Sequence, residues 1–130
     1  MPLKSIYLTV PVNADGDGTV TANTNQGLLG PILSVQYIKA SSGGYANGVD
    51  FNVTLVNSGQ TVWAQSDVNA SVTVRPKVLN QATAGTDLTA IYDHIYAHGE
   101  PIRIVVAQGG VSTTGKFVIF AMDAPPGGIC

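Results

Sequence analysis

The sequence predicts an all-β protein: a jelly-roll-like antiparallel β-sandwich of about eight strands in one domain. Three observations support this prediction. Short β-branched segments with alternating apolar residues recur along the 130-residue chain; clusters of Gly, Asn, Asp and Ser separate them; and helical periodicity is almost absent. A single open sheet would leave one apolar face in water, so strands of this number imply two packed sheets or a barrel.

Alternating apolar residues mark each expected strand. In Lys4–Val12, alternate residues such as Ile6 and Val10 share one face. The next run, Gly18–Thr24, alternates in the same way, so we expect these two strands to pair as a hairpin. Six further runs have the same character: Pro31–Ala40, Asp50–Val56, Thr61–Asp67, Ala70–Pro76, Ile102–Gln108 and Lys116–Met122.

One segment, Asp87–His98, leaves two alternatives open. Leu88, Ile91 and Ile95 recur at helical spacing, but the run fits a strand after a turn equally well. We expect irregular structure in four stretches: Asn25–Gly30, Ser41–Val49, Lys77–Thr86 and the tail Asp123–Cys130.

The composition excludes several classes of partner. The chain is 45% hydrophobic and only 11% charged, with a net charge of −2. Lys and Arg occur singly, so no basic patch is available for nucleic acid. No apolar run approaches the roughly 18 residues of a membrane helix, so we expect no membrane partner. The only cysteine, Cys130, cannot form an internal disulfide. A weakly charged surface of this kind favours association with itself or with a larger surface.

The stretch GGVSTTGKF resembles a phosphate-binding loop through Gly110, Gly115 and Lys116. Phe117 stands where that loop needs a hydroxyl for Mg²⁺, and an apolar β-like run follows instead of a helix. We therefore predict a glycine-rich turn between two antiparallel strands.

A second motif, Asn13–Thr24, carries Asp15 and Asp17 at the spacing of a calcium loop. Its twelfth position is Thr24 rather than a bidentate Glu, and strands rather than helices flank it. This motif is predicted to be a polar hairpin turn.

Few residues suggest catalysis or metal binding. His94 and His98 are four apart, which would put them on one face of a helix, but no third ligand is evident. Glu100 is the only glutamate, and no second carboxylate pairs with it for acid–base work. The sequence thus predicts no catalytic, metal-binding or cofactor-binding residue, and no enzyme.

Aromatic residues leave a binding module open as the alternative function. Trp63, Tyr37, Tyr45 and Phe51 could form a platform for sugar, as in carbohydrate- or receptor-binding sandwiches. Alternation favours the core for Trp63 and Phe51. Tyr45, in the loop SSGGYANG, is the better candidate for an exposed contact.

Two long phrases carry a resemblance to a known family. They are PILSVQYIKASSGGYANGVDFNVTLVNSGQTVWAQSDV, residues 31–68, and GEPIRIVVAQGGVSTTGKFVIF, residues 99–120. The chain resembles the capsid decoration, or cement, proteins of tailed bacteriophages, most specifically at Gly48–Phe51 and Ile102–Phe120. The resemblance implies a self-associating jelly roll, with a dimer favoured, on the outer surface of the virion capsid. Its partner would be the phage major capsid protein, whose neighbouring copies it would tie together, and no catalytic residue is implied.

For such a role we expect contacts at the chain ends and irregular loops. The amino-terminal strand could add to a partner sheet, and the proline-containing tail would lose little entropy on binding. The candidate interface residues are Leu3, Ile6, Tyr7, Tyr45, Pro125, Pro126 and Ile129.

Overall fold

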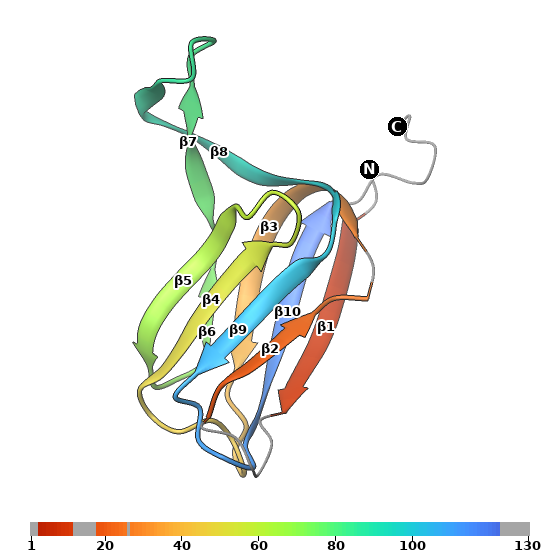
Figure 1. Ribbon diagram of the computed structural model, residues 1–130, viewed down its shortest axis with the longest axis vertical. Helices are drawn as coiled ribbons and strands as arrows, with labels where there is room; N and C mark the ends of the chain where they lie inside the picture. Colours follow the sequence, from red (N-terminus) through yellow and green to blue (C-terminus); the bar gives the residue numbers. More distant parts are fainter. Residues whose placement is uncertain (1–2, 12–17, 26, 123–130) are drawn as a thin grey trace.

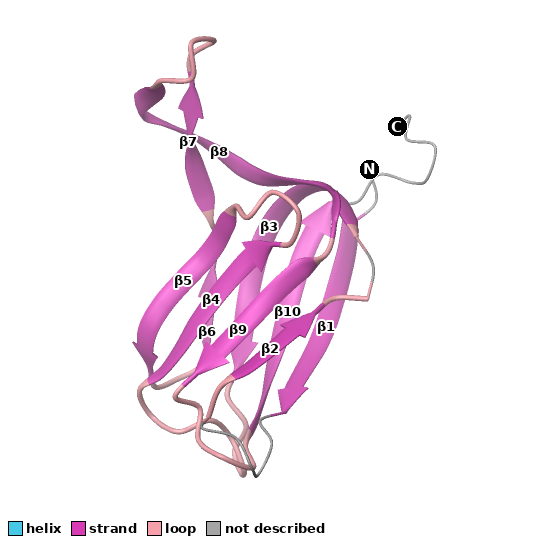
Figure 2. Ribbon diagram, in the orientation of Figure 1, coloured by secondary structure: helices cyan, strands magenta, loops and turns pink. Residues whose placement is uncertain are grey.

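Ten β-strands form the described part of the chain, residues 3–11, 18–25 and 27–122 of the computed structural model, and no helix occurs in it (Figures 1 and 2). The all-β prediction is confirmed. The strands are β1 Leu3–Pro11, β2 Val20–Asn23, β3 Leu28–Ile38, β4 Val49–Leu55, β5 Thr61–Val68, β6 Val72–Val74, β7 Lys77–Gln81, β8 Asp87–Glu100, β9 Ile102–Ala107 and β10 Thr114–Met122.

Two antiparallel sheets pack face to face as a sandwich (Figure 1). The larger sheet has the order β1-β10-β3-β8-β7, with β6 paired to β3, and the four-stranded sheet has the order β2-β9-β4-β5. The chain therefore pairs with itself as if folded in half: β1 with β10, β2 with β9, β3 with β8 and β4 with β5. This nesting is the jelly-roll order, to which β6 and β7 are added.

The predicted hairpin of the first two strands is wrong. β1 pairs with β10 and β2 with β9, in different sheets. The glycine-rich loop after Ala107 likewise crosses from β9 in one sheet to β10 in the other instead of turning within one sheet. Alternation shows which face of a strand is buried but not which strand lies beside it, and short sequence separation favoured the wrong neighbour in both places.

The segment that remained ambiguous, Asp87–His98, lies in strand β8. Ile95 and Ala97 face the core, and Ile95 lies opposite Ile32 of β3, which is also buried. The prediction that Lys77–Thr86 is irregular is wrong in part, because Lys77–Gln81 forms β7 against β8. The stretch Asn25–Gly30 also differs, since β3 begins at Leu28.

Aromatic rings fill one end of the core. Phe51 lies 4.7 Å from Tyr37, 5.0 Å from Phe117 and 5.5 Å from Trp63, measured between ring centroids. The prediction that Trp63 and Phe51 are core residues is confirmed. The prediction that Tyr45 is exposed is wrong: its ring stacks on Tyr37 and only 2% of the residue is accessible.

The hydroxyl of Tyr45 explains why a tyrosine from a loop is buried. It donates a 2.6 Å hydrogen bond to the carbonyl oxygen of Val10, so its polar end is satisfied inside the core. A Cβ on Gly115 would overlap the Tyr45 ring, so the glycine makes room for it. Burial raises the pKa of Tyr45 well above its usual value.

Candidate interaction surfaces

The two outer faces of the sandwich differ in chemistry. Among the described residues, the exposed large apolar side chains are Tyr7, Leu29, Ile38, Ile91, Tyr92, Tyr96 and Val111, and none belongs to the four-stranded sheet. That sheet presents polar residues such as Thr21, Asn23 and Asn52 to solvent. The larger sheet and its extension are therefore the apolar side of the molecule, where contact with another protein would remove apolar surface from water.

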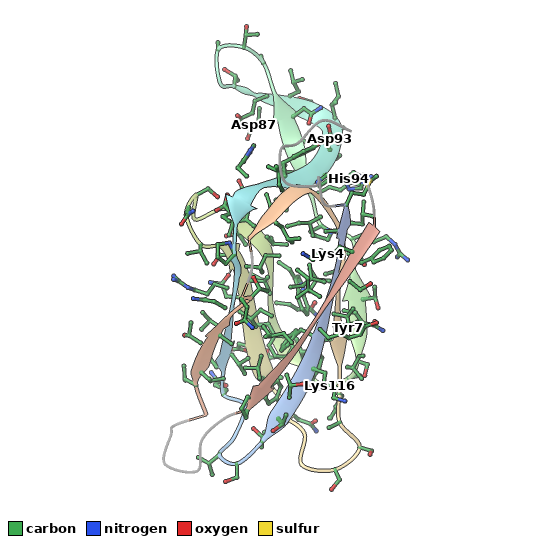
Figure 3. All side chains as sticks on the ribbon, turned by 90° about the vertical axis from the view of Figure 1, so that its right-hand side faces the viewer. Lys4, Tyr7, Asp87, Asp93, His94 and Lys116 are labelled. Atoms are coloured by element: carbon green, nitrogen blue, oxygen red, sulfur yellow. The ribbon has the colours of Figure 1, made fainter. Side chains whose placement is uncertain are left out.

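Strand β1 combines an exposed ring with an open sheet edge. Tyr7 is 77% exposed, the highest value among those residues, and lies beside Val118 of β10 in the sheet register. Ile6 points the other way and packs against the core. β1 crosses the front of the molecule in Figure 3, and within the described chain it pairs only with β10.

Residues 79–93, called the arm here, project from the sandwich as a two-stranded ribbon (Figure 1). No arm residue belongs to the core cluster, and Val78 at its base is the last residue of β7 that packs against it. Ile91 is 51% exposed and Tyr92 58%. A ribbon of two strands is marginally stable in water on its own, so contact with a partner would stabilise the arm.

A large bulge interrupts the pairing of the two strands next to the tip of the arm. Residues 88–91 of β8 lie opposite Asn80 alone, because Tyr92 pairs with Leu79 and Asp87 with Gln81. Ala90, inside the bulge, has a φ of +56°, a left-handed conformation that costs an alanine roughly 1 kcal/mol. Bulges redirect side chains, and this one ends at the exposed pair, with Ile91 its last residue and Tyr92 the first paired residue after it.

The histidines do not form a metal site. On strand β8, His94 and His98 share a face but are separated by about 13 Å at the strand rise per residue. Across the described residues, no group of three His, Cys, Asp or Glu side chains lies close enough together to hold a metal ion. No described segment forms a helix able to span a membrane.

Glu100 has a structural environment. Its Oε1 accepts hydrogen bonds from the backbone N–H of Asn57 at 2.9 Å and of Ser58 at 2.8 Å, and its Oε2 accepts a longer one from His98 at 3.4 Å. Burial alone would raise the pKa of the carboxyl, but these bonds outweigh it and lower the pKa. An ionised group that fastens the β4–β5 turn to β8 is not placed for proton transfer.

The predicted interface residues lie in different environments. Leu3, Ile6 and Tyr7 all lie on β1, and of Ile6 and Tyr7 only Tyr7 faces solvent. Tyr45 is buried and is not an interface residue. Pro125, Pro126 and Ile129 lie outside the described residues, as do Asp15 and Asp17 of the calcium-like motif.

Sequence reasoning missed the arm and the exposed residues of β8. A signal was present, because Tyr92, His94, Tyr96 and His98 alternate with period two and share one outer face. The helical spacing of Leu88, Ile91 and Ile95 obscured it.

The comparisons with known proteins add no family. No family model matches the chain, and no curated protein is significantly similar to it. Among solved structures it is similar to a crystal structure of FLHE, with 11% identity over 93% of this chain and 98% of that one and a TM-score of 0.46. It is also similar to a chain in the structure of the infectious bursal disease virus Gx strain, with 11% identity over 95% of this chain but 38% of that chain, and a TM-score of 0.25.

Proposed function

We propose that this protein is a structural virion protein that decorates the outer surface of a tailed-bacteriophage capsid and cements neighbouring copies of the major capsid protein. The proposal begins from the resemblance of residues 31–68 and 99–120 to cement proteins. The observation in the structure that best supports it is the arm, which extends from a jelly-roll body and has exposed Ile91 and Tyr92 at its bulge.

The arm is the proposed contact with the shell. It offers Tyr92, an aromatic residue of the kind that dominates protein interfaces, beside the apolar Ile91, on a segment that does not pack against the core. Docking would bury both side chains and support the ribbon. Two or more such contacts per assembly would make the lattice harder to open, because the second contact forms at high effective concentration.

The alternative, a carbohydrate- or receptor-binding module, has lost the residues that suggested it. Tyr37, Tyr45, Phe51 and Trp63 are all in the core cluster and cannot form an exposed platform.

The test is co-sedimentation of the purified protein with capsids that lack it, followed by heating of decorated and bare particles to their DNA-release temperature. We expect saturable binding and a higher release temperature for decorated particles. The double variant Ile91→Ser, Tyr92→Ser should weaken binding at least about tenfold, since it removes most of the apolar contact area of the arm. Val111→Ser is the matched control, because Val111 is as exposed as Ile91 but lies on the β9–β10 loop.

Two results would contradict the proposal at different levels. A folded wild-type protein that does not bind the capsid would overturn the cement function. Unchanged binding by the double variant would leave the function standing and remove the arm from it.

A further inference from the structure

Among the described strands, β1 is the one long edge strand without the usual protection against pairing. Proteins guard exposed edges with short strands, prolines, bulges or central charges. β1 has nine residues, its register with β10 is unbroken from Leu3 to Pro11, its only charged residue is Lys4 near one end, and its only proline is its last residue. Such an edge is ready to accept another strand.

The other edges of the two sheets carry the protection that β1 lacks. β2 is only four residues long. The pairing of β5 with β4 is interrupted by two register shifts. The edge formed by β6 and β7 is divided at Pro76, and the register of β7 with β8 shifts at the arm bulge. The contrast points to β1 as the edge left open for pairing.

The sequence of β1 is complementary to itself in the antiparallel direction. A twofold axis at Tyr7, the central residue of Leu3–Pro11, pairs the whole strand with a second copy. Tyr7 then faces Tyr7 of the copy, and Ser5 faces Thr9. Both are favourable pairs across strands, and Lys4 faces Val10, so that no like charges meet.

The same axis covers the most exposed apolar side chain. Tyr7 points outward from the larger sheet, so the rings of two copies would lie together over the joined edge. Aromatic pairs of this kind stabilise an association beyond the area they bury. Shifting the pairing of the two strands by an even number of residues would also keep the outer faces of both copies on one side. Only the register centred on Tyr7 pairs all nine residues of the strand.

We propose that two copies of this chain associate through antiparallel pairing of their β1 strands, with the twofold axis at Tyr7, so that their larger sheets become one continuous sheet. This deepens the dimer expected for the proposed function by identifying the contact. The dimer itself requires no capsid, so it can be tested on the purified protein alone.

The experiment measures the dimer dissociation constant by sedimentation velocity over a dilution series, in reductant so that Cys130 cannot link copies. Tyr7→Lys and Tyr7→Glu each place like charges opposite one another at the axis and should raise the dissociation constant at least about tenfold. Mixing these two variants should restore a dimer, because the lysine then faces the glutamate. Tyr7→Phe should stay within about twofold of the wild type, and Tyr92→Lys on the arm is the matched control with no expected effect.

The outcomes separate this inference from the cement function. A monomeric wild type at every concentration, or a dimer unaffected by both charged variants, would overturn the β1 contact even if the protein binds capsids. Loss of the dimer in both variants without rescue on mixing would refute the axis at Tyr7. The exposure of Tyr7 makes unfolding unexpected, and a thermal melt of each variant checks it.

Discussion

The hydrogen bonds that Glu100 accepts from the β4–β5 turn and from β8 should contribute measurably to stability, and their contribution should depend on pH. The side chain is 2% exposed, and three backbone N–H groups donate to its two oxygens. A hydrogen bond to a charged group contributes about 1.5–3 kcal/mol. Because Asn57 and Ser58 are themselves exposed, water can replace part of what is lost, and the lower half of that range applies.

Glu100→Gln should reduce the free energy of unfolding by about 1.5–2 kcal/mol at pH 7. The amide oxygen can still accept from Asn57 and Ser58, but without charge, and its NH₂ group then faces the N–H of His98. Glu100→Ala removes every acceptor and should cost about 3 kcal/mol. Denaturant unfolding followed by fluorescence of the single tryptophan, Trp63, measures both changes.

The pH dependence has a definite sign. The pKa of Glu100 in the folded protein lies below its ordinary value of 4.5, so the folded state binds fewer protons than the unfolded chain near that pH. The stability from this carboxylate is therefore fully present above pH 4.5 and is lost as the pH falls through the folded-state pKa. The difference between wild type and Glu100→Gln should shrink in that range.

The control is Asp87→Asn, at an exposed carboxylate whose described hydrogen bond is to the side chain of Gln81. It should change stability by less than about 0.5 kcal/mol. A loss of stability in Glu100→Gln no larger than in this control at pH 7, or one that stays constant in acid, would show that the Glu100 carboxylate does not stabilise the fold through its charge.

Two further predictions concern Tyr45 and Ala90. Tyr45→Phe removes the buried hydrogen bond to Val10 and should cost about 1–2 kcal/mol of stability in denaturant unfolding, while leaving capsid binding unchanged. A neutral effect on stability would show that this bond has no net value. Ala90→Gly relieves a left-handed residue and should raise the melting temperature by a few degrees, an effect of roughly 1 kcal/mol. A lower melting temperature would mean that the strain at Ala90 is smaller than the entropy that glycine adds to the unfolded chain.

Much of the fold was predictable because alternation is a local property. The runs expected at Asp50–Val56 and Thr61–Asp67 match β4 and β5 to within one residue at each end. The pairing of strands is a long-range property. β1 pairs with β10, which is separated from it by nearly the whole chain, and no local pattern encodes that neighbour. The hairpin prediction failed for this reason.

The candidate sites were predicted less well, also for identifiable reasons. Tyr7 was expected at an interface and is exposed, because it alternates with inward-facing Ile6 and Leu8 on β1. Tyr45 was misplaced because loop residues are usually exposed, whereas this loop folds back so that its tyrosine fills the space beside Gly115. The arm contains the bulge opposite Asn80, and a bulge interrupts the alternation of residues from which strands are predicted in a sequence.

β1 and β7 are the opposite edges of the larger sheet. Pairing of two copies at β1 would therefore place the two arms at the far edges of one continuous sheet, about nine strand spacings or roughly 40 Å apart across the sheet. Because the two β1 strands would be antiparallel, the arms would also project from opposite ends of that sheet (Figure 1). A monomer has one arm and can only coat a surface, whereas a dimer carries two arms that are held apart by a rigid sheet and can bridge two subunits. The two proposals together predict that the Tyr7→Lys variant still binds single capsid subunits but loses most of its stabilisation of the shell.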